Sequence, residues 1–247
     1  MHFKHYIFCC LLLGLLACKT NKTYITELDY TRIDLEPSFP SESEIEKIIA
    51  PYKEKLGNEM DEILAQNEQD LRKQKPNSFL GNWFTDILHE QGEKLTNLEI
   101  DFAAQNHGGF RIPVVPKGPI PVGKIYELMP FDNTLIILEL DGSTTKKLID
   151  RIADYGGWPI SKGLSFVLDD GKASNILING KALDLQGTYT IALPDYVANG
   201  GDDCEFLKGQ KAINTGVFIR DVVINYLRQF PSSDNITVDK TKRIIIN

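Results

Sequence analysis

Apolar residues recur at helical spacing from about residue 40 onward. Ser41 and Ser43 each stand three residues before a glutamate, which is the spacing of a capping box at a helix start. Apolar positions three and four residues apart then continue beyond residue 60. These positions are Ile45, Ile48, Ile49, Tyr52, Leu56, Met60, Ile63 and Leu64. The pattern predicts one helix from Ser41 to Leu71.

Three further helices are predicted by the same spacing. One is capped by Asn77 or Ser78, and its apolar residues are expected to face a core. They are Phe79, Leu80, Trp83, Phe84, Ile87 and Leu88. The other two helices run from Ser143 to Tyr155, after an Asp141-Gly142 turn, and from Val217 to Leu227.

Short apolar runs between these helices predict strands. The runs are Leu98–Phe102, Thr134–Leu140, Ser165–Leu168, Ala173–Ile178, Tyr189–Leu193 and Arg243–Ile246. Helices and strands mix without the regular alternation of a parallel fold. We therefore expect an α+β or mixed α/β fold, a single domain over residues 41–247 with mixed sheet layers and flanking helices.

The first 18 residues are typical of an export signal. The apolar run from Tyr6 to Leu16 is too short to span a bilayer and suits a signal peptide. It ends in Leu15-Leu16-Ala17-Cys18, a bacterial lipobox pattern in which Cys18 carries the lipid. An ordinary signal peptide cut after Ala17, or a short membrane anchor, is the alternative. We expect a membrane-anchored lipoprotein of the cell envelope, at the outer membrane facing the periplasm, with residues 19–40 as tether.

The net charge and the cysteine content exclude some classes of function. A net charge of −7 and a pI near 5.2 argue against a nucleic-acid polymer as partner, because a phosphate backbone requires a basic surface. A single nucleotide requires only one or two local cations. Beyond Cys18 the one cysteine is Cys204, between Asp203 and Glu205. Neighbouring negative charge disfavours a thiolate, so we interpret Cys204 as structural rather than as a nucleophile.

The sequence contains no pattern of a metal-dependent hydrolase. Two metals that activate a water need a cluster of His, Asp and Asn side chains. Beyond the signal the chain holds two histidines, His89 and His107. We expect His89 on the solvated face of its helix and His107 in a glycine turn that lines a site. No catalytic residue, metal ligand or cofactor is predicted in this chain.

Three segments place polar or aromatic side chains just beyond predicted strands or turns. Asn106-His107-Gly108-Gly109-Phe110-Arg111 offers an amide and a guanidinium beside glycines that allow close approach, although such stretches are most often plain turns. Met129-Pro130-Phe131-Asp132-Asn133 offers a ring, for which a place in the core is the alternative. Pro194 to Asp203 offers Tyr196 and then Asp202, whose carboxylate can accept hydrogen bonds from a sugar diol.

In this order the segments resemble the 5'-nucleotidase C-terminal domain family. That family shows Asn-x-Gly-Gly-x-Arg, then Pro-Phe-x-Asn, then an aromatic residue followed by x-Ala-x-Gly-Gly-Asp. Leu80-Gly81-Asn82 is similar to the family's Leu-Gly-Asn segment, and the predicted helix 41–71 is similar to the segment leading into that domain. The resemblance covers roughly residues 40–246.

The resemblance implies a nucleotide-recognition site. Phe131 and Tyr196 would clamp a purine or pyrimidine between two rings. Asn106 would meet the base or ribose, Arg111 the phosphate or ribose side, and Asp202 the ribose hydroxyls.

The chain departs from the family in two places. The family carries a further Arg shortly before Leu-Gly-Asn, and here Arg72 or Lys75 would have to replace it. Full-length members also have an N-terminal metallophosphoesterase domain, which supplies two metals and the attacking water, and which this sequence does not show. We therefore expect a substrate-recognition subunit that a separately encoded metallophosphoesterase joins, by way of the helix at 41–71, to hydrolyse nucleoside 5'-monophosphates. Divalent metals would belong to that partner chain. A nucleoside- or nucleotide-binding lipoprotein for scavenging, or a domain with a decayed site, is the alternative.

Overall fold

The computed structural model describes residues 43–247. The expected signal peptide, Cys18, the tether and Ser41 lie outside the described residues. The chain divides into two units, residues 1–47 and 48–247, and of the first only the start of helix α2 (Ser43–Met60) is described. Within residues 43–247 no helix combines the length and apolar character needed to cross a membrane.

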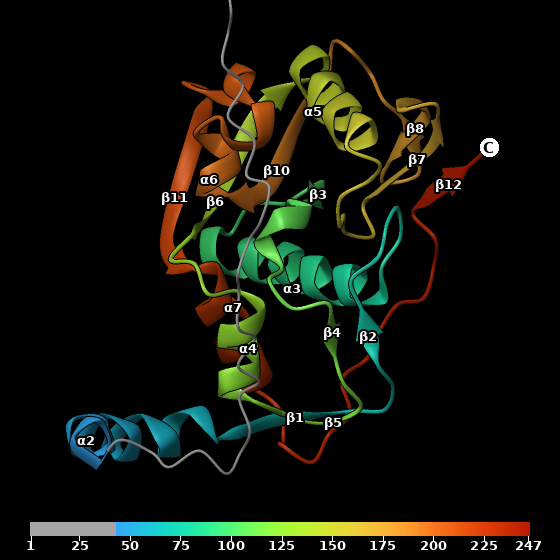
Figure 1. The fold of residues 1–247 in the computed structure, drawn as a ribbon. Coiled ribbons are helices and arrows are strands. Elements are labelled where there is room, and N and C mark those ends of the chain that lie inside the picture. Colours follow the sequence, from blue (N-terminus) through green and yellow to red (C-terminus); the bar gives the residue numbers. More distant parts are fainter. Residues whose placement is uncertain (1–42) are drawn as a thin grey trace, which may run out of the picture. The chain divides into compact units, whose positions relative to one another are not determined.

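The second unit is built around a four-stranded sheet with the strand order β11-β6-β10-β3 (Figure 1). Its strands are β3 (Phe102–Ala103), β6 (Thr134–Asp141), β10 (Thr188–Pro194) and β11 (Lys211–Phe218). β6 is antiparallel to β10 and β11, while β10 is parallel to β3. Side chains of a strand alternate between faces, and in β6 Ile137 joins one core cluster while Ile136 and Leu138 join the other. The continuous apolar run of β6 is therefore explained by burial on both faces.

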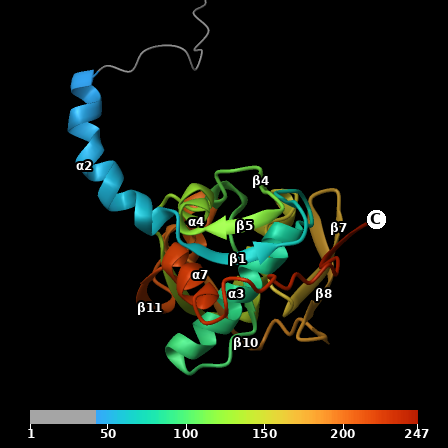
Figure 2. The same cartoon turned by 90° about the horizontal axis from the view of Figure 1, so that it is seen from below.

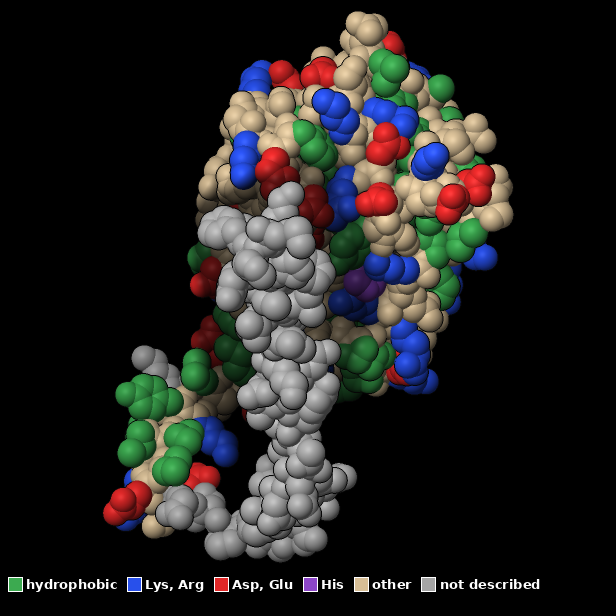
Figure 3. Space-filling model, turned by 45° about the horizontal axis from the view of Figure 1, so that its top comes forward, with side chains coloured by type: hydrophobic (Ala, Val, Ile, Leu, Met, Phe, Trp, Pro, Cys, Tyr) green, Lys and Arg blue, Asp and Glu red, His purple; other side chains and the backbone are tan. Residues whose placement is uncertain are grey.

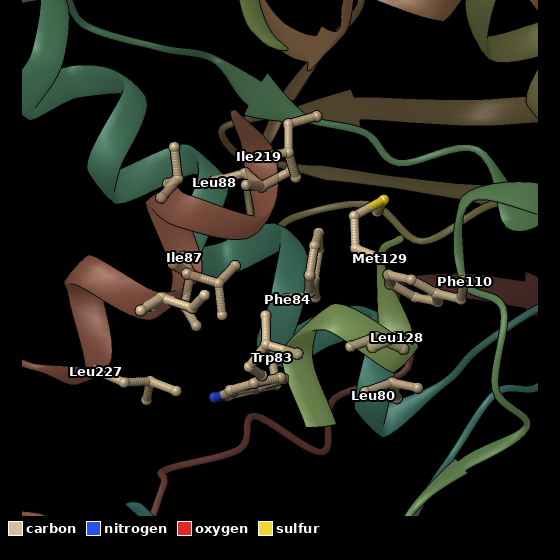
Figure 4. Packing of buried hydrophobic residues seen from close by; sticks show 14 of the residues in the cluster. Leu80, Trp83, Phe84, Ile87, Leu88, Phe110, Leu128, Met129, Ile219 and Leu227 are labelled. Atoms are coloured by element: carbon tan, nitrogen blue, oxygen red, sulfur yellow. The ribbon is translucent and has the colours of Figure 1, made fainter. Parts of the chain in front are cut away.

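Helices cover the two faces of this sheet. On one face α3 (Phe79–Thr96) packs against α7 (Ile219–Leu227), and α4 (Val122–Leu128) packs against α7. Figure 2 shows α3 and α7 side by side, and Figure 4 shows Trp83, Phe84 and Ile87 of α3 among apolar side chains of α4 and α7. On the other face α5 (Gly142–Asp154) packs against β6 and β10.

A second four-stranded sheet, in the order β12-β7-β8-β9, meets α5 through β8. Its strands are β7 (Leu164–Asp169), β8 (Lys172–Ile178), β9 (Lys181–Ala182) and β12 (Ile244–Ile246). Two short antiparallel pairs complete the strands: β1 (Ile63–Asn67) with β5 (Gly118–Pro121), and β2 (Leu71–Arg72) with β4 (Val114–Val115). The predicted mixed α/β fold is confirmed.

Several predicted elements agree with the structure. Ser78 caps α3 by accepting a hydrogen bond from the Gly81 amide at 3.0 Å, whereas Asn77 binds the main chain of β12. The predicted inward side chains of α3 are buried except Phe79, which is 39% exposed. The predictions for β6, α5, β7, β8, β10 and β12 are confirmed to within two residues.

The predicted helix from Ser41 to Leu71 is wrong beyond Met60. Ile63 and Leu64 fit helical spacing, but they belong to β1, where they pair with β5 of much later sequence. The backbone of β1 makes its hydrogen bonds with β5, and the local spacing of apolar residues does not show such a distant partner.

The strand predicted at Leu98–Phe102 is also displaced. α3 ends at Asn97 in the left-handed conformation (φ 57°), and the chain then runs irregularly until Phe102 and Ala103 pair with β10. The last predicted helix starts at Ile219 rather than Val217, because Val217 belongs to β11, a strand the sequence did not predict. Most of β11 is exposed, so it carries no apolar alternation.

Leu80-Gly81-Asn82 has a packing role in this fold. A Cβ at Gly81 would lie 2.9 Å from Cβ of Pro159, so α3 approaches that segment closely only with glycine here. The buried Asn82 amide donates to the carbonyls of Asp239 and Thr241, at 2.9 and 3.0 Å. This motif therefore fastens the C-terminal segment to α3.

Candidate functional site

A surface cleft of about 350 Å³ brings the five sequence-predicted site residues together. Its lining consists of Asn106, Gly108, Gly109, Arg111, Phe131, Asn133, Tyr196 and Asp202. The strand pairing explains this convergence. The parallel strands β3 and β10 end at the same edge of the sheet, and β6 begins there because it is antiparallel to β10, with Leu135 opposite Pro194. The segments after β3, before β6 and after β10 therefore meet.

The two aromatic rings of the cleft are solvent-accessible. Phe131 is 38% exposed and Tyr196 is 46% exposed, so the alternative that Phe131 fills the core is wrong. The Arg111 guanidinium lies 5.6 Å from the centroid of the Phe131 ring, within the range of a cation–π contact.

Glycine at position 201 is required by the Tyr196 ring. A Cβ there would lie 2.4 Å from ring atoms of Tyr196. The turn that follows is left-handed, with φ of 51° at Asp202 and 60° at Asp203. Non-glycine residues seldom adopt this conformation, and aspartate is among those that tolerate it. The turn directs Asp202 into the cleft lining.

A hydrogen-bonded chain of side chains fixes Asp202. Gln105 Nε2 donates to Asn106 Oδ1 at 2.8 Å, and Asn106 Nδ2 donates to Asp202 Oδ2 at 2.7 Å. The Tyr196 hydroxyl donates to the other Asp202 oxygen at 3.3 Å. A Cβ at Gly109 would lie 2.2 Å from Gln105 Nε2, so the glycine makes room for this chain. Both amide atoms of Asn106 are engaged within the protein, while the Asp202 oxygens keep lone pairs for further donors.

Positive groups gather beside the Asn106–Arg111 turn. Lys73 donates to the Phe110 carbonyl at 2.8 Å, and burial, followed by repulsion from Arg111 and Lys75, lowers the Lys73 pKa. Burial also lowers the pKa of Lys75, whose ammonium lies 3.9 Å from the centroid of the Tyr155 ring. Figure 3 shows Lys and Arg side chains, in blue, on the same face as a histidine, in purple. Such mutual repulsion indicates positive charge that an anion can offset.

Lys73, Lys75 and Arg111 form the basic group of the site, and His107 lies beside it. Burial, followed by the charges of Lys73 and Lys75, lowers the His107 pKa to about 4. Its Nδ1 is buried without a hydrogen-bond partner among the described residues. The structure also distinguishes the two candidates for the missing upstream Arg by position. Arg72 is exposed and pairs with Asp70 at 2.8 Å, whereas the charge of Lys75 acts on His107 in the turn and lowers its pKa.

The prediction that His89 is solvated is wrong. His89 is 8% exposed, and its Nδ1 lies 3.0 Å from Oγ of Ser161, with Glu93 3.6 Å from Nε2. This order of groups is that of a serine nucleophile with its base and acid. However, Ser161 is fully buried, and its Oγ accepts a hydrogen bond from the Ala103 amide at 2.8 Å. The arrangement therefore joins α3 to β3 and offers a substrate no access.

Among residues 43–247 the structure shows neither a cluster of metal ligands nor a reactive thiol. Among residues 43–247, no group of three or more His, Cys, Asp or Glu side chains is arranged to hold a metal ion. Cys204 is buried, and burial raises the pKa of its thiol to about 12. A thiol that stays protonated at neutral pH is a structural side chain, as predicted.

The fold and the cleft together define a class of protein. It is a mixed α/β domain whose cleft, at one edge of the sheet, is lined by aromatic and acidic side chains and lies beside basic ones. Residues 56–209 match the family described as 5'-nucleotidase, C-terminal domain, and the chain belongs to that family. It is 27% identical over 210 residues to a 5'-nucleotidase of Vibrio vulnificus, covering 80% of this chain and 36% of the relative. It is 31% identical over 132 residues to a 5'-nucleotidase of Vibrio cholerae, covering 51% of this chain and 24% of the relative.

Among solved structures, the chain is similar to a 5'-nucleotidase precursor of Thermus thermophilus. The TM-score is 0.70 at 25% identity, over 84% of this chain and 44% of that chain. A putative 5'-nucleotidase of Staphylococcus aureus shares the fold, with a TM-score of 0.69 at 18% identity over 85% of this chain and 45% of that chain. The chain thus spans less than half the length of these relatives.

Proposed function

We propose that this chain is the nucleotide-recognising component of a 5'-nucleotidase system. The observation that carries the proposal is the cleft itself, in which two exposed rings, Phe131 and Tyr196, share one lining with Asp202. The relatives named 5'-nucleotidase support the ligand class.

Each part of a nucleotide has a counterpart in the cleft. The base stacks between the rings, and stacking contributes about 1–3 kcal/mol for any base. The Asp202 carboxylate accepts hydrogen bonds from the ribose hydroxyls. The 5'-phosphate lies on the side of Arg111, where Lys73 and Lys75 add positive charge. Asn106 orients Asp202 and borders the ribose.

Hydrolysis requires a partner in this proposal. A separately encoded metallophosphoesterase chain brings two metals and the attacking water to the bound nucleoside 5'-monophosphate. Helix α2 offers a docking face, because Ile48, Tyr52 and Leu56 are 68%, 68% and 50% exposed. Apolar side chains gathered on one exposed face are typical of an interaction surface.

A second candidate is a nucleoside- or nucleotide-binding lipoprotein for scavenging. The cleft lining holds two rings, a guanidinium and a carboxylate, which can bind a nucleoside or nucleotide without hydrolysing it. In both versions we propose that a lipid on Cys18 anchors the protein in the cell envelope, at the outer membrane facing the periplasm.

Two measurements test the proposal. Isothermal calorimetry with AMP and adenosine should detect binding to the purified chain, and absence of heat at millimolar ligand would contradict it. Phosphate release from AMP with Mn²⁺, Zn²⁺ or Co²⁺ should be absent for the chain alone. Addition of the metallophosphoesterase should produce release with a KM that rises in a Phe131→Ala variant. Binding without any such partner effect would favour scavenging.

A further inference from the structure

We propose that Arg151 and Arg220 are positioning residues that hold the two sides of the cleft in their binding geometry. Neither lines the cleft, and neither was singled out from the sequence. The inference deepens the proposed function and rests on it for the identity of the ligand.

Arg220, in the first turn of α7, holds the segment that carries Phe131. Its Nη1 donates to the Phe131 carbonyl at 3.2 Å, and its Nη2 donates to Asp132 Oδ1 at 2.7 Å. The guanidinium carbon lies 4.7 Å from the Tyr126 ring centroid and 5.2 Å from that of Phe218. The side chain is 11% exposed, so its position is set by packing as well as by charge.

Arg151, near the end of α5, holds the turn that carries Asp202. Its Nε donates to the Asp202 carbonyl at 2.8 Å, and its Nη2 donates to Asp203 Oδ2 at 2.6 Å. Its Nη1 pairs with Asp154 at 2.7 Å, which fixes the guanidinium on its own helix. The side chain is 18% exposed.

The two arginines make the same pair of contacts. Each binds the main-chain carbonyl of a cleft residue and the carboxylate of the residue that follows it. The planar guanidinium makes both contacts at once, which a lysine ammonium cannot do with the same geometry. On the Asp202 side the contact also stabilises two successive left-handed residues. A cleft fixed before binding loses less conformational freedom when the ligand arrives.

The two arginines act on different parts of the ligand. Arg220 acts through Phe131, and therefore on base stacking. Arg151 acts through Asp202, and therefore on recognition of the ribose hydroxyls. Adenosine and 2',3'-dideoxyadenosine distinguish them, because the second lacks the diol.

The experiment is calorimetry of both nucleosides with Arg220→Gln and Arg151→Gln. Each variant should bind adenosine about three- to tenfold more weakly, the range expected when one or two side chains must be ordered on binding. Arg151→Gln should lose most of the preference for adenosine over dideoxyadenosine, while Arg220→Gln should keep it. Combining Arg220→Gln with Phe131→Ala should weaken binding no further than Phe131→Ala alone, because the two changes remove one interaction.

The matched control is Arg228→Gln. Arg228 makes a two-point contact with Glu62, at 3.0 and 2.5 Å, away from the residues that line the cleft. This variant should bind both nucleosides as the wild type does. Full affinity in both test variants would overturn the inference, as would, in Arg151→Gln, an equal loss for both nucleosides that follows the fall in melting temperature.

Amide hydrogen exchange of the free protein separates this inference from the proposed function. Exchange should accelerate at residues 131–133 in Arg220→Gln and at residues 202–204 in Arg151→Gln. A wild type that binds no adenosine would refute the proposed function and, with it, the assignment of a ligand. Unchanged exchange in both variants would refute the positioning role even if the wild type binds.

Discussion

Asn106 donates a hydrogen bond to Asp202 at 2.7 Å, although the two residues are 96 positions apart in the sequence. The bond joins the turn after β3 to the turn after β10, the two parallel neighbours of the sheet. It commits the Asn106 amide to the carboxylate. In the proposed nucleotide complex Asn106 would therefore act on the ribose through Asp202.

Removing either ring should weaken nucleoside binding and leave the fold intact. We expect Phe131→Ala and Tyr196→Ala each to cost about 1–3 kcal/mol of adenosine binding, which is about five- to 150-fold in Kd. The melting temperature should change little, because the rings are 38% and 46% exposed. Calorimetry and thermal unfolding measure the two effects.

Phe110 provides the control for these variants. It lies in the same turn as Asn106 but is 1% exposed. Its ring packs edge-on against the Phe84 ring, with the two ring centroids 4.9 Å apart. Phe110→Ala should lower the free energy of unfolding by about 3–5 kcal/mol. A loss of stability of that size in Phe131→Ala would contradict the clamp.

The basic group should distinguish AMP from adenosine. Arg111→Gln, Lys73→Gln and Lys75→Gln should each weaken AMP binding by about 0.5–2 kcal/mol, the range for a partly exposed charge contact, and leave adenosine binding nearly unchanged. Arg72→Gln is the matched control, because Arg72 pairs with Asp70 instead. Equal affinities for AMP and adenosine in the wild type would show that the cleft binds nucleosides without a phosphate contact.

His107 should make stability depend on pH in a defined window. Its pKa in the folded protein is about 4, below the usual 6.5, so the unfolded chain takes up a proton first as the pH falls. The contribution is fully present above pH 6.5 and is lost as the pH falls toward 4. Denaturation by urea at pH 7 and pH 5 should show a smaller loss for His107→Gln than for the wild type. An NMR titration of His107 centred near 6.5 would contradict this prediction.

Cys18 should carry lipid and become the N-terminus of the mature protein. The Leu-Leu-Ala-Cys ending of a short apolar run motivates this, and several acyl chains suffice for stable membrane attachment. Mass spectrometry should find a diacylated or triacylated Cys18. Cys18→Ala should leave the membrane fraction or accumulate as precursor, and an intact signal with unmodified Cys18 in the wild type would refute the prediction.

The fold was predictable where burial leaves a local pattern. α3, α5 and β6 follow their apolar spacing because each packs against the core along its length. β1 and β11 were not predicted. Their pairing partners lie far away in the sequence, and β11 is largely exposed, so neither carries a local signal of its state.

The cleft residues were predictable for a different reason. Phe131, Tyr196 and Asp202 stand in segments whose glycines and prolines follow a recognisable order. Arg151 and Arg220 stand on helices among ordinary charged residues, and only the three-dimensional structure shows what they contact. The burial of His89 could not be predicted from its own helix, because Ser161, whose Oγ lies 3.0 Å from the His89 Nδ1, comes 72 residues later.

Gly201 determines where the Tyr196 ring can lie in the cleft. The Tyr196 ring lies where a side chain at position 201 would stand, so a single added methyl group would displace the ring. The place of one cleft ring is thus governed by a position that has no side chain of its own. Because the Tyr196 hydroxyl donates to Asp202, a substitution at Gly201 would move this hydrogen bond together with the ring.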